Sequence, residues 1–79
     1  MLELFVYSRR GCHLCELMLE ELVPLCRDRA RITVRDVDTR EDWRNAYGQR
    51  VPVLCSGDRE ICAAHLDRGA LVALFPPSC

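Results

Sequence analysis

The feature that most limits the fold of this chain lies near the N-terminus, where a short apolar run is followed by a helical repeat. The run covers residues 2–7 (LELFVY), and a Ser-Arg-Arg-Gly turn follows it. Apolar side chains then recur at spacings of three and four between residues 14 and 25, which is the period of one helix face. We therefore predict a buried strand and then a helix that runs from Cys12 to about Arg27, with its last turn distorted by Pro24.

The middle of the chain repeats this change of pattern. Residues 31–37 (RITVRDV) alternate as a second strand. Thr39 is the predicted N-cap of a short helix with an acidic first turn, and Gly48 is its predicted end. Because a helix connects them, the first two strands are predicted to be parallel, with a right-handed crossover.

The last third of the chain has the pattern of a hairpin followed by a helix. Residues 51–55 and 60–63 predict two strands on either side of a tight turn. Asp67 is the predicted start of a last helix, which Pro76-Pro77 ends. The predicted order is β-α-β-α-β-β-α, an α/β fold with a four-stranded mixed sheet flanked by helices.

Length and composition exclude several classes of protein. A chain of 79 residues has room for one domain, which we place at residues 1–79. All 11 basic residues are arginines scattered among 12 acidic residues, so we expect no nucleic-acid partner. No apolar run approaches the roughly 20 residues that cross a bilayer, and the start Met1-Leu2-Glu3 lacks the pattern of an export signal. We expect a cytoplasmic monomer that does not bind membranes.

Two of the six cysteines form a Cys-x-x-Cys motif, Cys12 and Cys15, at the predicted junction of strand and helix. Free backbone N–H groups and the macrodipole at a helix N-terminus favour an anion, so we expect a stabilised thiolate at Cys12. Arg9, Arg10 and His13 are predicted to add positive charge near it. Cys15 lies one turn further along the helix, where it can resolve a mixed disulfide.

Other interpretations of the cysteines stay open at this point. Cys-x-x-Cys is also half of a zinc site, so Cys12 and Cys15 could belong to a zinc or iron module, and a redox-inactive interaction domain is a further alternative. Cys26, Cys55 and Cys62 lie in apolar segments and are predicted to be buried free thiols, although a hairpin could bring the last two together. The terminal Cys79 is a predicted site of adventitious dimerisation.

A second group of residues favours redox chemistry over the metal-binding and redox-inactive alternatives. Val51-Pro52 precedes a predicted strand, and a cis proline there would present the backbone of Val51 to the cysteine pair. Tyr7-Ser8, the Cys-x-x-Cys motif and the segment GQRVPVL at residues 48–54, before a hairpin and a last helix, together resemble a glutaredoxin-like member of the thioredoxin-fold superfamily. The resemblance covers nearly the whole chain and implies a thioredoxin-like fold.

The resemblance also implies thiol–disulfide exchange, with Cys12 attacking, Cys15 resolving and Pro52 in cis beside them. It implies a disulfide-containing protein or a glutathione-mixed disulfide as partner, with glutathione as candidate co-substrate, no bound cofactor and no metal. It places Val51 and Pro52 at the substrate, and we add Arg50, directly before them, as a candidate substrate contact of this chain.

The chain departs from the usual glutaredoxin pattern at three places. His13-Leu14 replaces Pro-Tyr inside the motif, Arg50 stands where threonine usually precedes Val-Pro, and Cys-Ala-Ala-His at residues 62–65 replaces a Gly-Gly pair followed by an acidic residue. Arg50 is therefore the candidate contact to the glycyl carboxylate of glutathione, and Asp67 is the candidate for the acidic contact to its γ-glutamyl end.

Overall fold

The computed structural model describes residues 2–75, so the predictions for Pro76, Pro77 and Cys79 lie outside the described part of the chain. The predicted order of strands and helices is confirmed, with one additional turn of 3-10 helix, η1, before the second helix. The elements are β1 (Leu2–Ser8), α1 (His13–Cys26), β2 (Ala30–Asp36), η1 (Val37–Thr39), α2 (Glu41–Tyr47), β3 (Val53–Ser56), β4 (Arg59–Ala63) and α3 (Arg68–Val72).

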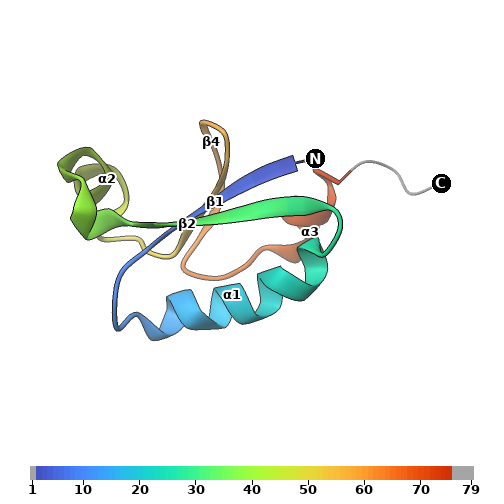
Figure 1. The fold of residues 1–79 in the computed structure, drawn as a ribbon, viewed down its shortest axis with the longest axis horizontal. Helices are drawn as coiled ribbons and strands as arrows, with labels where there is room; N and C mark the ends of the chain where they lie inside the picture. Colours follow the sequence, from blue (N-terminus) through green and yellow to red (C-terminus); the bar gives the residue numbers. More distant parts are fainter. Residues whose placement is uncertain (1, 76–79) are drawn as a thin grey trace.

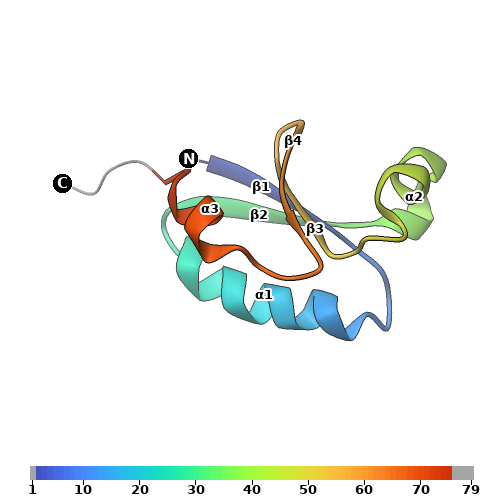
Figure 2. The same cartoon turned by 180° about the vertical axis from the view of Figure 1, so that it is seen from behind.

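The four strands form one mixed sheet in the order β2-β1-β3-β4. β1 and β2 are parallel, as a helical crossover requires, whereas β1 with β3 and β3 with β4 are antiparallel. Figures 1 and 2 show α1 and α3 together on one side of the sheet, while α2 lies beyond the sheet at the end where β1 leads into α1. This arrangement brings the start of α1 and the α2 region to the same end of the molecule.

Alternating side chains of β1 divide the interior into two parts. The helix-side core lies under α1 and α3 and consists of Leu4, Val6, Met18, Leu22, Cys26, Leu54 and Leu71. The α2-side cluster lies on the other side and consists of Tyr7, Val37, Val53 and Cys55, with Trp43 and Tyr47 packed against them. The helix-side core fixes the axis of α1, so it also fixes where that helix begins.

The structure differs from the sequence prediction in the last turn of α1 and at the start of α2, in each case for a local reason. α1 remains helical through Pro24 to Cys26. Because Pro24 and Glu20, whose carbonyl loses its helical partner, are both exposed, water can bind that carbonyl. The prediction that Thr39 caps the next helix is wrong: the Thr39 hydroxyl donates to the Asp36 carbonyl within η1, and Arg40 takes the N-cap without a side-chain bond.

The hairpin forms as predicted but does not pair its two cysteines. β3 begins at Val53 rather than at residue 51, and an irregular register places Cys62 opposite Leu54 and Cys55 opposite Glu60. Cys55 and Cys62 are free thiols, as is Cys26. Within residues 2–75, no helix combines the length and the apolar character needed to span a membrane.

Candidate functional site

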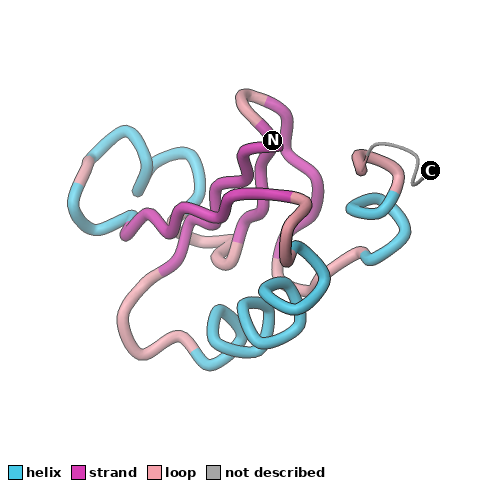
Figure 3. The backbone as a smooth tube through the Cα atoms, turned by 45° about the vertical axis from the view of Figure 1, so that its right-hand side comes forward, coloured by secondary structure: helices cyan, strands magenta, loops and turns pink. Residues whose placement is uncertain are grey.

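The cysteine loop, residues 9–12, connects β1 to α1 and is the connection between the magenta strand and the cyan helix at the lower left of Figure 3. Gly11 has φ +72°, a left-handed conformation that favours glycine, and the Cys12 N–H donates to the Arg9 carbonyl. This turn ends at Cys12, the extended N-cap residue of α1. The sequence therefore places the first cysteine at the tip of the helix.

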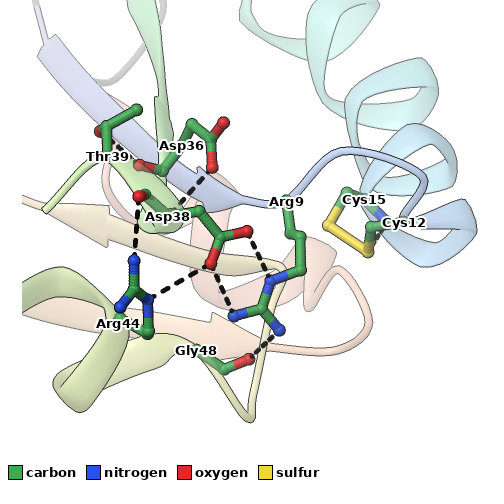
Figure 4. Close-up of polar contacts among 8 residues, drawn as sticks. All are labelled: Arg9, Cys12, Cys15, Asp36, Asp38, Thr39, Arg44 and Gly48. Carbon is green, nitrogen blue, oxygen red and sulfur yellow. Dashed lines mark hydrogen bonds and ion pairs between the residues drawn. A yellow bond between two sulfur atoms is a disulfide. The ribbon is translucent and has the colours of Figure 1, made fainter. Parts of the chain in front are cut away.

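The sulfur atoms of Cys12 and Cys15 form a disulfide, with the two Cα atoms 5.2 Å apart (Figure 4). Cys12 is half-buried, whereas Cys15 is only 3% exposed. The backbone N–H of Cys15 donates to the Cys12 sulfur over 3.2 Å, in the position of an N-cap hydrogen bond. An amide at the positive end of the helix dipole thus contacts the sulfur of the more exposed cysteine.

The predicted cis proline is present, because the Val51–Pro52 peptide bond is cis. Pro52 is buried and Val51 is half-buried. The Pro52 carbonyl accepts the N–H of Ala64 over 2.8 Å, which ties this segment to the residue after β4. The structure therefore has both parts of the predicted constellation, the cysteine pair and a cis proline.

Comparison with known proteins identifies the family. The model of the Glutaredoxin-like domain (DUF836) matches residues 3–75. The chain belongs to the glutaredoxin-like domain family. No match was found among curated proteins.

Two solved structures resemble this glutaredoxin-like domain. The solution structure of protein Ne2328 from Nitrosomonas europaea is 36% identical, with a TM-score of 0.85 over 95% of this chain and 92% of that chain. The X-ray structure of protein XcR50 from X. campestris is 32% identical, with a TM-score of 0.69 over 89% of this chain and 91% of that one. Both likenesses support the α/β thioredoxin-like fold.

The three predicted charge-tuning residues lie in different settings. His13 has a side chain that is 81% exposed, and its Nδ1 lies 3.9 Å from a carboxylate oxygen of Glu16. Arg10 is exposed. Arg9 extends toward Asp38 and Gly48 rather than toward the sulfurs (Figure 4). The positive charge of Arg9 is thus already paired with a carboxylate.

The carboxylate that pairs with Arg9 belongs to Asp38, a residue that the sequence did not single out. Its carboxylate accepts two hydrogen bonds from Arg9, from Nε over 3.0 Å and from Nη2 over 3.2 Å, and lies 3.4 Å from Nε of Arg44. The hydrogen bond from Arg9 holds the pKa of the Asp38 carboxyl below its usual range, and the same contact raises the pKa of Arg9. A lone aspartate in a turn carries no sequence signal for such a pairing.

The predicted substrate residue Arg50 is also engaged with a carboxylate. Its Nη1 donates to both carboxylate oxygens of Glu60, over 2.8 and 2.9 Å, and its Nη2 donates to the Ala46 carbonyl. Arg9, Arg44 and Arg50 line one cavity of about 600 Å³ at the end of α2, together with Asn45, Ala46, Gly48 and Gln49. Three guanidinium groups with two carboxylate partners leave this cavity positively charged.

A smaller groove lies between α1 and the segment after β4. It has a volume of about 130 Å³, and its lining mixes apolar side chains with Glu21 and His65. Among residues 2–75, no group of three or more His, Cys, Asp or Glu side chains gathers as a metal-binding set would. The described residues thus include a bonded sulfur pair at a helix N-terminus and, in a separate segment, a cis proline.

Proposed function

We propose that this protein is a thiol–disulfide oxidoreductase that reduces protein disulfides or glutathione-mixed disulfides through the Cys12–Cys15 dithiol. The observation that carries the proposal is the bonded sulfur pair at the start of α1, with the Cys15 amide directed at the Cys12 sulfur. Such an amide and the helix dipole stabilise a thiolate more than a thiol, and the thiolate is the nucleophile in disulfide exchange.

The exposures of the two cysteines assign their roles. In the reduced protein, the Cys12 thiolate attacks one sulfur of the substrate disulfide, and the other substrate sulfur leaves as a thiolate. Cys15, which is nearly inaccessible, then loses its proton and attacks the Cys12 sulfur. The substrate sulfur that was bonded to Cys12 leaves as a thiolate, and the Cys12–Cys15 disulfide forms. Two electrons have then passed to the substrate. A thiol reductant restores the dithiol.

Electrostatic tuning of the nucleophile is part of the proposal. The helix N-terminus supplies the main effect, with His13 and Arg10 as smaller positive contributions from solvent-exposed positions. Arg9 is paired with Asp38, so its net contribution at the sulfur is reduced. We expect the Cys12 thiolate to predominate at neutral pH.

Arg50, Val51 and Pro52 are the proposed substrate contacts, and glutathione is the candidate co-substrate. The positive cavity beside Arg9 and Arg50 supports binding of a carboxylate. One carboxylate oxygen of Asp67 accepts the N–H of Ala70 at the start of α3, so this side chain is less free to bind an ammonium group. The proposed setting is the cytoplasm, where thiol reductants keep such a pair reduced, with the protein acting as a monomer.

Trapping with a Cys15→Ser variant tests the proposal. Without the resolving sulfur, the mixed disulfide between Cys12 and its substrate should persist, and mass spectrometry should detect the added mass of glutathione or of a partner protein. The matched control is the Cys12→Ser, Cys15→Ser double variant, which keeps every other cysteine. Equal trapping by both variants would refute the assigned role of Cys12. Stoichiometric zinc or iron in protein purified under reducing conditions would favour the metal-binding alternative.

A further inference from the structure

Two separate segments of the chain make up the proposed site, and Arg9 connects them. Arg9 belongs to the cysteine loop, and its backbone carbonyl accepts the N–H of Cys12 over 3.3 Å. Its side-chain Nη1 donates to the carbonyl of Gly48 over 3.0 Å, in a partly buried contact. Gly48 stands four positions before Pro52, at the start of the segment that leads to the cis proline. Arg9 therefore adds a side-chain link between two segments that the pairing of Tyr7 with Val53 in the sheet already brings near each other.

Asp38 determines where the Arg9 side chain points. Two parallel hydrogen bonds from a guanidinium to one carboxylate fix both the position and the plane of the guanidinium (Figure 4). With Nε and Nη2 held by Asp38, the remaining nitrogen Nη1 is directed at Gly48. Arginine is suited to this arrangement because its donors form a rigid fork, which a lysine ammonium group cannot reproduce.

Asp38 is itself held in place by its surroundings. Its N–H donates to the Asp36 carboxylate over 2.9 Å, and its carbonyl accepts a hydrogen bond from Nη2 of Arg44 over 3.0 Å. The preceding residue, Val37, is completely buried in the α2-side cluster. The carboxylate thus projects from an anchored turn, and it transmits that fixed position to Arg9.

We infer that Asp38 is a positioning residue for the proposed disulfide exchange and that it acts through Arg9 by holding the cysteine loop against the segment that leads to Pro52. The inference rests on the proposed function and adds a residue to it. A substrate that spans both segments needs them at the correct separation, and a misplacement of about 1 Å can cost roughly 10²-fold in rate. Since Asp38 and Arg9 are 44% and 38% exposed, we expect a smaller effect of about tenfold.

A double-mutant cycle on the reduced protein tests this coupling. The rate constant is measured in a single turnover with a synthetic peptide closed by one internal disulfide, for wild type, Asp38→Asn, Arg9→Ala and the double variant. Each single variant should react about tenfold more slowly. The double variant should be no slower than the slower single variant, because both changes break the same connection. Additive losses, or no loss in Asp38→Asn, would overturn the inference.

A second readout separates positioning from a charge effect on the sulfur. The rate of Cys12 alkylation by iodoacetamide depends on the thiolate alone, so a positioning role predicts that Asp38→Asn leaves it within about twofold of wild type. A fall in alkylation as large as the fall in peptide reduction would show that Asp38 acts on the thiolate and would overturn the inference. Asp38→Glu, which keeps the carboxylate, should restore part of the peptide reduction.

Asp42→Asn is the matched control. Asp42 also forms a double hydrogen bond with an arginine, Arg40, over 2.8 and 3.0 Å, but neither of these side chains contacts the cysteine loop in the structure. The control should reduce the peptide at the wild-type rate. If wild-type protein reduces the peptide no faster than Cys12→Ser, the proposed function itself fails. An active wild type with an additive cycle rejects only the role of Asp38.

Discussion

The two ends of α1 each carry a cysteine, and the two cysteines have opposite environments. Cys12 precedes the first turn, is half-buried and accepts an amide hydrogen bond. Cys26 is the last helical residue, is 1% exposed and packs in the helix-side core. Burial raises the pKa of the Cys26 thiol, whereas helix N–H groups favour a thiolate at Cys12. We therefore expect the reactivity of each thiol to depend on the helix end and on access to solvent.

Replacing Cys12 or Cys26 by serine should give the largest contrast in the rate of disulfide reduction. Cys12→Ser should lower the rate of disulfide reduction by roughly three orders of magnitude or more, because the nucleophile is lost. Cys26→Ser should reduce disulfides at the wild-type rate, since this side chain lies in the core, at the other end of the helix. The measurement is single-turnover reduction of a disulfide peptide by pre-reduced protein. Comparable activity losses in the two variants would break the comparison.

Stability should respond in the reverse order. Cys26→Ser places a hydroxyl in the helix-side core, with an expected loss of about 1–3 kcal/mol in the free energy of unfolding. Cys12→Ser in reduced protein should cost less than about 1 kcal/mol, because serine is also a good N-cap. Urea denaturation in the presence of a reductant measures both values. A larger loss for Cys12→Ser would mean that the active end also carries the fold.

The sequence predicted the opposite environments of Cys12 and Cys26 because both environments follow from local sequence patterns. A Cys-x-x-Cys motif between an apolar strand and a helical repeat places Cys12 at a helix start, and the apolar neighbours of Cys26 place it in the core. The strand order follows from the same patterns and from the handedness of the crossover.

The parts that the sequence could not predict depend on contacts between distant residues. Asp38 and Arg9 stand 29 positions apart, and no periodicity relates them. The same holds for Arg50, whose contact with Glu60 depends on the hairpin register. The N-cap of α2 is not at Thr39, because the Thr39 hydroxyl donates to the Asp36 carbonyl of the preceding turn. This contact could be recognised only if the end of β2 were already known. Charged side chains at a surface have many potential partners, and only the fold selects among them.

The pH dependence of alkylation sharpens the comparison at the level of the sulfur. We expect the reduced Cys12 to react with iodoacetamide with a midpoint below about pH 7, at least about 1.5 units under the free-thiol pKa of about 8.5. Cys26 should stay unmodified in the folded protein over the same range, because its pKa is raised by burial. Mass spectrometry of the separate peptides gives both profiles. A Cys12 midpoint at or above the free-thiol value would remove the basis of the proposed mechanism.

The raised pKa of Cys26 also predicts how stability changes with pH. A thiol whose folded pKa lies above its unfolded value stabilises the fold below the unfolded pKa, and this contribution is lost as pH rises toward the folded pKa. The free energy of unfolding of the reduced protein should therefore decrease above about pH 8.5. Cys26→Ala should reduce this alkaline decrease, as seen in urea denaturation at several pH values. The same slope in both proteins would show that Cys26 does not contribute.

His13 gives the smallest expected effect, and it tests how much of the Cys12 environment comes from side chains. His13→Ala should raise the Cys12 alkylation midpoint by no more than a few tenths of a unit, because a ring that is 81% exposed acts through water. His13→Gln, which keeps a polar side chain without a titratable ring, is the control. It should give the same Cys12 midpoint as His13→Ala. A shift of a full unit, suppressed by 1 M salt, would assign most of the thiolate stabilisation to His13. The helix N-terminus would then be the lesser cause, and the contrast between the two ends of α1 would depend on one exposed imidazole.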